Sequence, residues 1–297
     1  SMGVVELGRP GRAAWFFRTS RRTAIDQPGA CSESWGGALS TPVPNAGVAV
    51  EVAYEDPHYL VLNKAGGRVV QPGRGHQDDA LLNGLLASRF GPELRKLGAR
   101  RDFGVIHRLD RDTSGALLVA RTVPGYDGLR SAFTERRVEK DYLVLVHPDP
   151  SSPSGRVDLP LREVERAGVR LAVPDPAGQP AHTAWRKVAA GPKHAMLACR
   201  ISTGRLHQIR VHLTEGVGVQ IMGDRIYRVD APPDTSSKAM RLAGPMHLHA
   251  WRLGFPHPVT DRPEQHRIEP PPSFVSAMAE CGLPVSYTHL TLPTIRL

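Results

Sequence analysis

The segment that most restricts the fold is GVIHRLDRDTSGALLVART, residues 104–122, in which a charged cluster leads directly into an apolar run. Residues 116–120 carry no polar side chain and predict a buried strand. Unpaired charge away from water is energetically costly. Residues 107–112 therefore form either a structural network of ion pairs or a functional site, and this segment alone leaves both interpretations open.

Length and composition are those of a globular protein with a substantial core. The chain has 297 residues, 40% hydrophobic and 23% charged, which suffices for one large domain or two ordinary ones. Its apolar runs are too short to cross a bilayer, and no signal-peptide pattern begins it. Cys31, Cys199 and Cys281 lack CxxC spacing, so we expect no disulfide framework, no zinc–thiolate site and a cytoplasmic location.

The charge balance favours a polyanionic partner. The formal net charge is +9 and the isoelectric point about 9.9, which indicates nucleic acid first. Arginine supplies most of the positive charge, and Gly, Pro and Ala are abundant, a combination that genomic composition bias also produces. A basic soluble enzyme without nucleic-acid binding therefore remains an alternative on charge alone.

Three regions are predicted: an irregular leader over residues 1–47, one mixed domain over 48–275, and a tail over 284–297. The composition of the tail differs from that of the rest of the chain, and the sequence leaves open whether the tail is native. Strands are predicted at 48–54, 59–63, 116–120, 139–146, 169–173, 183–188, 195–201 and 246–255. Helices are predicted at 79–90 (capped by Asp78 or Asp79), 125–137 and 203–213. Strands mixed with helices, without a regular βαβ repeat, indicate an α+β fold with a mainly antiparallel sheet.

The segment EKDYLVLV, residues 139–146, also joins charged residues to an apolar run that is expected to be buried. Alternation of period two places Tyr142 and Val144 on one face of the strand and Leu143 and Leu145 on the other. Tyr142 thus stands at the polar entrance of a buried strand. An ordinary tyrosine at the core edge explains that residue equally well.

The segment STGRLHQIRVHL shows helical periodicity. Leu206, Ile209 and Leu213 form a core stripe, and His207 and Arg210, three residues apart, share a neighbouring face. A helix anchored by such a stripe would hold the guanidinium of Arg210 in one place. The alternative is an exposed, solvated arginine.

HRLDRDTSG, EKDYLVLV and TGRLHQIRVHL, in this order, resemble the three motifs of RluA-type pseudouridine synthases. DPHYLVLNKAGG, GDRIY and HLHAWRLGFPHP extend the resemblance over residues 48–272. The chain departs from the family at Ala65 and Gly66, where proline is common, and at Gln220. The resemblance implies the pseudouridine synthase fold, a mixed, mainly antiparallel sheet with flanking helices and a central RNA-binding cleft.

The resemblance also implies residue roles. Asp110 corresponds to the catalytic aspartate, Tyr142 to the tyrosine that stacks on the target base, and Arg210 to the arginine that pairs with the aspartate. Ile209 would pack beneath the pocket and Arg108 would help to displace the target nucleotide. The implied substrate-binding residues lie in the same motifs: His107, Arg108, Arg205, His207 and Ile209.

The implied activity is isomerisation of uridine to pseudouridine in structured RNA, either ribosomal or transfer RNA, by a monomer that needs no cofactor or metal. No P-loop and no GxGxxG occurs, and His247 and His249 are expected to be structural or to face RNA. Whether Asp110 acts as nucleophile or as base stays open. The alternatives are a non-catalytic RNA-binding protein, or a hydrolase using Asp112 as a second carboxylate.

Overall fold

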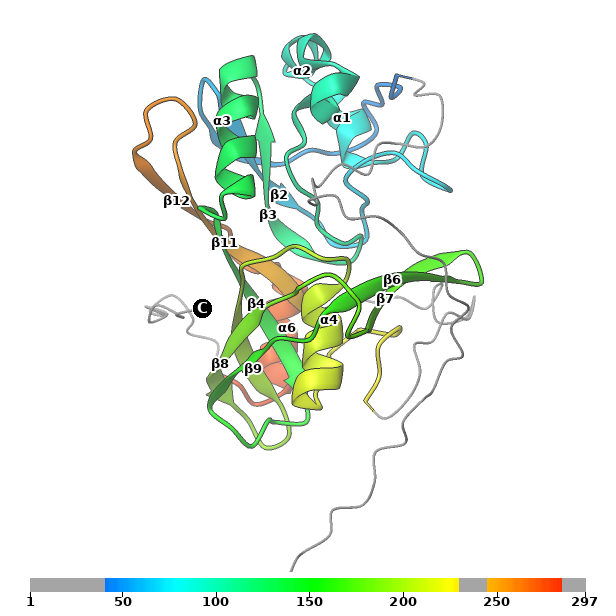
Figure 1. The fold of residues 1–297 in the computed structure, drawn as a ribbon, viewed down its shortest axis with the longest axis vertical. Coiled ribbons are helices and arrows are strands. Elements are labelled where there is room, and N and C mark those ends of the chain that lie inside the picture. Colours follow the sequence, from blue (N-terminus) through cyan, green and yellow to red (C-terminus); the bar gives the residue numbers. More distant parts are fainter. Residues whose placement is uncertain (1–40, 230–244, 285–297) are drawn as a thin grey trace, which may run out of the picture. The chain divides into compact units, whose positions relative to one another are not determined.

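In the computed structural model, residues 41–229 and 245–284 are described, and they build one ten-stranded sheet with helices on both faces (Figure 1). The sheet runs in the order β1-β2-β3-β11-β4-β9-β8-β5, with β10 paired to β4 and β12 to β11, and β6 and β7 form a separate hairpin. The strands are β1 (Val52–Glu55), β2 (Tyr59–Lys64), β3 (Ser114–Ala120), β4 (Glu139–His147), β5 (Ser154–Val157), β6 (Leu161–Arg166), β7 (Val169–Pro174), β8 (Thr183–Ala190), β9 (Ala195–Ile201), β10 (Gln220–Ile221), β11 (Leu248–Pro256) and β12 (Pro263–Arg267).

The parallel pair β3–β11 joins the two halves of the sheet, while the other described strand pairs are antiparallel. Gly115 lies opposite Ala250 in this pair with φ +108°. A Cβ at Gly115 would stand 2.2 Å from the Ala250 carbonyl oxygen, so only glycine permits this approach. The glycine of the HRLDRDTSG segment thus sets the start of β3 directly against β11.

The two faces of β4 pack against different elements, as the alternation predicts. Tyr142 and Val144 belong to the main core cluster. Leu143 and Leu145 belong to a second cluster, formed with helix α6 (Pro272–Glu280). Period-two side-chain direction therefore decides which part of β4 faces the site and which part faces α6.

Helices α1 (Leu81–Ala87), α2 (Gly91–Leu97), the 3₁₀ segment η1 (Ala99–Gly104) and α3 (Val123–Thr134) accompany β1–β3 (Figure 1). Helix α4 (Gln208–Val211) continues as the π-helical turn η2 (His212–Val217). Ile209 and Leu213 from this continuous segment enter the main core cluster. α4 and α6 therefore lie on opposite faces of the sheet.

Several predicted boundaries are wrong. The strand predicted at 48–54 is shorter and occupies Val52–Glu55. The helix predicted at 79–90 is only Leu81–Ala87, and neither Asp78 nor Asp79 caps it, because its N-cap residue is Ala80. The helix predicted at 203–213 starts at Gln208, because His207 has a left-handed backbone, φ +50°. The predicted leader and tail fall almost entirely outside the described residues.

Candidate active site

The loop that carries the HRLD segment runs along β3 beyond its short pairing with β11, which involves only Ser114 and Gly115. Val105 bridges Val119, and the backbone N–H of Leu118 donates to His107 Nε2 at 2.9 Å. Burial lowers the pKa of His107 to about 3, so the ring is neutral and accepts this bond. Its ring also stacks on Phe133 at 5.1 Å. His107, predicted to bind substrate, is thus held against β3 and anchors the loop.

Lys64 also holds this loop in place, and it was not among the site residues predicted from the sequence. It is fully buried, and its ammonium donates to the carbonyls of Ala65 (3.0 Å), Arg111 (2.9 Å) and Thr113 (2.7 Å). Burial lowers the pKa of Lys64 to about 7, against the opposing effect of Asp110. The only available signal was a lysine that ends an apolar strand. Lys64 fixes the backbone on either side of Asp112.

Arg210 stands between two aspartates. Its Nε and Nη2 donate to Asp224 at 2.7 and 2.9 Å, and its Nη1 lies 3.4 Å from Asp110 Oδ2. Arg210 is 4% exposed and Asp224 3% exposed, whereas the Asp110 side chain is 22% exposed. The predicted pair of Asp110 and Arg210 is therefore present but long, and the main partner of Arg210 is Asp224.

Burial disfavours both charges in the inner pair, but their mutual attraction prevails. Burial lowers the pKa of Arg210, yet Asp224 and then Asp110 raise it above its ordinary value. Burial raises the pKa of Asp224, yet Arg210 lowers it below the ordinary range of a carboxyl group. Both groups are consequently charged at neutral pH.

The GDRIY segment positions Asp224, which sequence reasoning did not assign to the site. Asp224 Oδ1 accepts the backbone N–H groups of Ile226 (2.9 Å) and Tyr227 (3.2 Å). The guanidinium of Arg210 lies over the Tyr227 ring at 5.0 Å. An acidic residue inside a segment matched to the family was the available signal, but only the fold brings it to Arg210.

Tyr142 is buried at the start of β4, in the same core cluster as Leu109 and Ile209. Residues from all three motifs therefore contribute to the main core cluster. Burial raises the pKa of Tyr142, and Asp110 and Asp141 raise it further, so the phenol is neutral and lies within electrostatic reach of Asp110. No described residue hydrogen-bonds its hydroxyl.

Asp141, the residue before Tyr142, links β4 to the neighbouring strands β9 and β11. Asp141 is 1% exposed and accepts from Arg200 on β9 (2.6 and 2.9 Å) and from Arg252 on β11 (2.6 Å). Two guanidinium groups thus compensate one buried carboxylate. This pairing fixes the strand at the point where it presents Tyr142.

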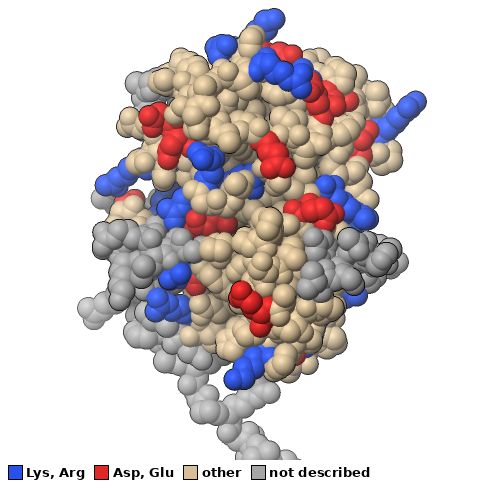
Figure 2. Space-filling model, turned by 180° about the vertical axis from the view of Figure 1, so that it is seen from behind, with Lys and Arg blue, Asp and Glu red and all other residues tan. Residues whose placement is uncertain are grey.

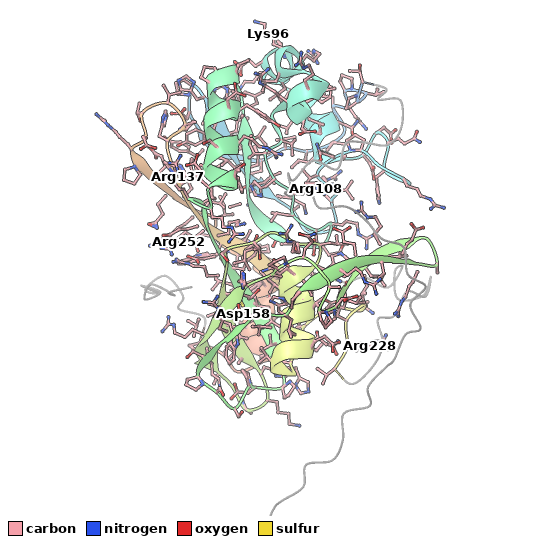
Figure 3. The ribbon with its side chains drawn as sticks, in the orientation of Figure 1. Lys96, Arg108, Arg137, Asp158, Arg228 and Arg252 are labelled. Carbon is pink, nitrogen blue, oxygen red and sulfur yellow. The ribbon has the colours of Figure 1, made fainter. Side chains whose placement is uncertain are left out.

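The predicted substrate-binding residues occupy different settings. His207 places Nδ1 2.8 Å from the Tyr227 hydroxyl, and Arg205 donates Nε to the Pro180 carbonyl at 3.1 Å. Ile209 is buried. Arg108 is exposed, without a partner among the described residues, and lies between the α1–α3 region and α4 (Figure 3). Arg108 is therefore the most accessible of the five.

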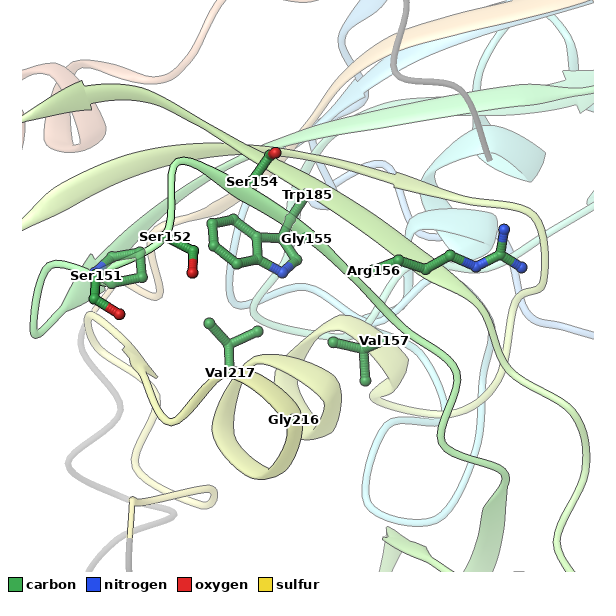
Figure 4. Close-up of a pocket in the computed structure, with 10 residues that line it drawn as sticks. Ser151, Ser152, Ser154, Gly155, Arg156, Val157, Trp185, Gly216 and Val217 are labelled. Atoms are coloured by element: carbon green, nitrogen blue, oxygen red, sulfur yellow. The ribbon is translucent and has the colours of Figure 1, made fainter. Parts of the chain in front are cut away.

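Other features do not belong to this site. A cavity of about 210 Å³ lies beside Trp185 and Val217 and includes none of the predicted site residues (Figure 4). His249 bonds Ser114 (2.9 Å) and the Ile268 carbonyl (2.8 Å), a structural role. Within the described part of the chain, no cluster of metal-ligating side chains and no helix suited to spanning a membrane occurs. Basic and acidic side chains are interspersed on the face in Figure 2.

Similarity to known proteins identifies the family of this chain. A family model described as RNA pseudouridylate synthase matches residues 58–215. Ribosomal large subunit pseudouridine synthase D of Zymomonas mobilis is 34% identical over 225 residues, 75% of this chain and 70% of that protein. The protein of the same name from Nitrosomonas europaea is 36% identical over 212 residues, 71% of this chain and 59% of that protein.

A solved structure gives the same fold. Human RNA pseudouridylate synthase domain containing 4 superposes with a TM-score of 0.60 at 24% identity, covering 79% of this chain and 94% of that one. The α+β fold with a mixed, mostly antiparallel sheet is thereby confirmed. The chain belongs to the RNA pseudouridylate synthase family, as its three motifs predict.

Proposed function

We propose that this protein isomerises specific uridines of ribosomal RNA to pseudouridine and that Asp110 is the reacting carboxylate. Family membership supports the reaction, and the names of the bacterial relatives support ribosomal RNA as the substrate. The observation that carries the proposal for Asp110 is that, unlike Asp112 and Asp224, its carboxylate has no two-bond guanidinium partner among the described residues.

The neighbouring carboxylates are each engaged by a guanidinium. Asp224 accepts two bonds from Arg210. Asp112 accepts two from Arg111, at 3.0 and 3.2 Å. Asp110, by contrast, has one long contact among the described residues and is partly exposed. A hydrolase with two acting carboxylates would need Asp112 as well, and its engagement with Arg111 counts against that alternative.

The chemistry needs one ionised carboxylate. The N1–C1′ bond of uridine breaks, the uracil turns, C5 bonds to C1′, and the C5 proton is lost while N1 gains a proton. Asp110 begins this sequence by attacking C1′ or by removing the 2′ proton. Because Asp224 already balances the charge of Arg210, the remaining N–H can orient Asp110 without neutralising it.

The substrate must leave the RNA stack to reach Asp110. Extruding a nucleotide costs about 3 kcal/mol, and stacking on an aromatic ring returns about 1–3 kcal/mol per base. In the proposed complex Tyr142 stacks on the base, and the buried side chain of Ile209 packs beneath the pocket. Arg108 has an exposed guanidinium suited to a phosphate or to the space that the base vacates.

The test is release of tritium from ribosomal RNA labelled at C5 of uridine. Wild-type protein should release label and form pseudouridine, and Asp110→Asn should release none. Asp112→Asn is the matched control, because it removes a nearby carboxylate that already has a partner, and it should retain most activity. Formation of free uracil would identify a hydrolase, and an active Asp110→Asn would refute the assignment of the carboxylate.

A further inference from the structure

His207 has a strained backbone conformation and precedes by three residues Arg210, which contacts the proposed reacting carboxylate. Its φ of +50° and ψ of +22° lie in the left-handed region, and helix α4 begins at the following residue. Residues other than glycine rarely adopt this conformation, and such residues concentrate at functional sites. The backbone geometry aims the imidazole at the Arg210–Tyr227 side of the site, where it meets the Tyr227 ring edge-on.

The hydrogen-bond partners of Tyr227 decide which nitrogen of His207 carries a proton. The Ala172 backbone N–H donates to the Tyr227 hydroxyl oxygen at 3.0 Å, and that oxygen lies 2.8 Å from His207 Nδ1. If Nδ1 carried the proton, the hydroxyl proton of Tyr227 would have no acceptor among the described residues, although Tyr227 is only 2% exposed. The hydroxyl therefore donates to Nδ1, and the ring proton resides on Nε2.

The imidazole is neutral and its Nε2–H is unused. Burial lowers the pKa of His207 to about 4, and Asp110 is the foremost charge acting against that effect. Tyr227, the partner of His207, also lies 5.0 Å from the Arg210 guanidinium, whose Nη1 is 3.4 Å from Asp110 Oδ2. Within the described part of the chain Nε2 has no partner, and the side chain is only half buried. His207 therefore offers a fixed, neutral donor, without an acceptor among the described residues, in the same site as the proposed reacting group.

We infer that His207 is a specificity-determining residue that donates its Nε2–H to the C4 carbonyl oxygen of the target uracil. The inference rests on the proposed function. Uracil presents carbonyl acceptors at C2 and C4, whereas cytosine presents an amino group at C4. A donor that cannot become an acceptor, because Tyr227 occupies the other nitrogen, would bind the uracil edge and leave a donor facing a donor with cytosine.

The activity test compares His207→Gln with His207→Leu. Both keep a Cβ on the strained backbone, so its cost cancels between them, but only glutamine retains a side-chain N–H. On tritiated ribosomal RNA we expect kcat/KM to fall at least tenfold in His207→Leu and to be largely restored in His207→Gln. Equal rates in the two folded variants, or an unchanged His207→Leu, would overturn the inference.

A spectroscopic test does not depend on turnover. Two-bond ¹H–¹⁵N spectra of histidine-labelled protein, with His207→Gln to assign the signal, should show the Nε2–H tautomer, and Tyr227→Phe should disturb it. A wild-type Nδ1–H tautomer would overturn the inference. If wild-type protein released no tritium at all, the proposed function would fail, while the spectra would still report whether Tyr227 fixes the ring.

Discussion

Replacing Asp224 by asparagine tests the buried ion pair on which the site geometry depends. Asparagine keeps the shape and one carbonyl oxygen of the side chain, but it loses the charge and turns an amide NH₂ toward the guanidinium of Arg210. Arg210 would remain 4% exposed and keep its charge. Asp110, at 3.4 Å, would then be its one remaining carboxylate contact among the described residues.

The expected loss of stability is large because both partners are buried. Removing one member of such a pair lowers the free energy of unfolding by about 3–5 kcal/mol. Because asparagine retains one acceptor oxygen, the expected loss for Asp224→Asn is about 3 kcal/mol. Asp127→Asn is the matched control. Asp127 accepts the same two-bond fork from Arg101, at 3.1 and 3.2 Å, but its side chain is 57% exposed. A solvated pair contributes little, so the control should lose far less stability.

Urea denaturation gives the stability difference, and tritium release gives the rate. Because Arg210 would turn toward Asp110 and hold it more tightly, we expect kcat to fall about tenfold or more in Asp224→Asn, which is about 1.4 kcal/mol. Asp127→Asn should match wild type in rate. Equal stability losses in the two variants, or a normal rate in Asp224→Asn, would refute this account of the pair.

The same pair predicts a dependence on pH. Burial raises and Arg210 more strongly lowers the pKa of Asp224, so the folded value lies below the unfolded value, about 3.9 for aspartate. The stabilisation is complete above that unfolded value and is lost as the pH falls through the folded one. The difference in unfolding free energy between wild type and Asp224→Asn should therefore be constant near neutrality and shrink in acid.

Three further predictions concern the loop, the base and the RNA backbone. Lys64→Met removes the donor to the Arg111 and Thr113 carbonyls and should lower kcat by loosening the loop of Asp110. Since the pKa of Lys64 is lowered to about 7, wild-type kcat should also fall as the pH rises above that value, a pH–rate limb that Lys64→Met should lack. Tyr142→Phe should bind RNA normally in filter-binding assays, whereas Tyr142→Ala should lose about 1–3 kcal/mol of binding energy. Equal RNA affinities of these two variants would exclude stacking. RNA affinity should fall linearly with salt on a log–log plot, and a flat response would exclude phosphate contacts.

The sequence alone was sufficient wherever local periodicity reflects burial. The alternation in EKDYLVLV predicts the two faces of β4 correctly, because side chains of a strand point alternately to opposite sides. The apolar run after the HRLD segment is the buried strand β3. Strand β9 matches its predicted limits, Ala195–Ile201. The exposed strand β12, whose side chains alternate between exposed and half-buried, was not predicted, because it carries no apolar run.

Recognition of the three motifs, and with it the family, also needed only the sequence. What the tertiary structure decided is how the charges are shared. Arg210 pairs mainly with Asp224 and only weakly with Asp110, and Lys64 donates to the backbone carbonyls of residues 111 and 113. Periodicity reports only which side of an element faces the core. Which charges meet depends on distances between distant segments, and those distances exist only after the sheet has assembled.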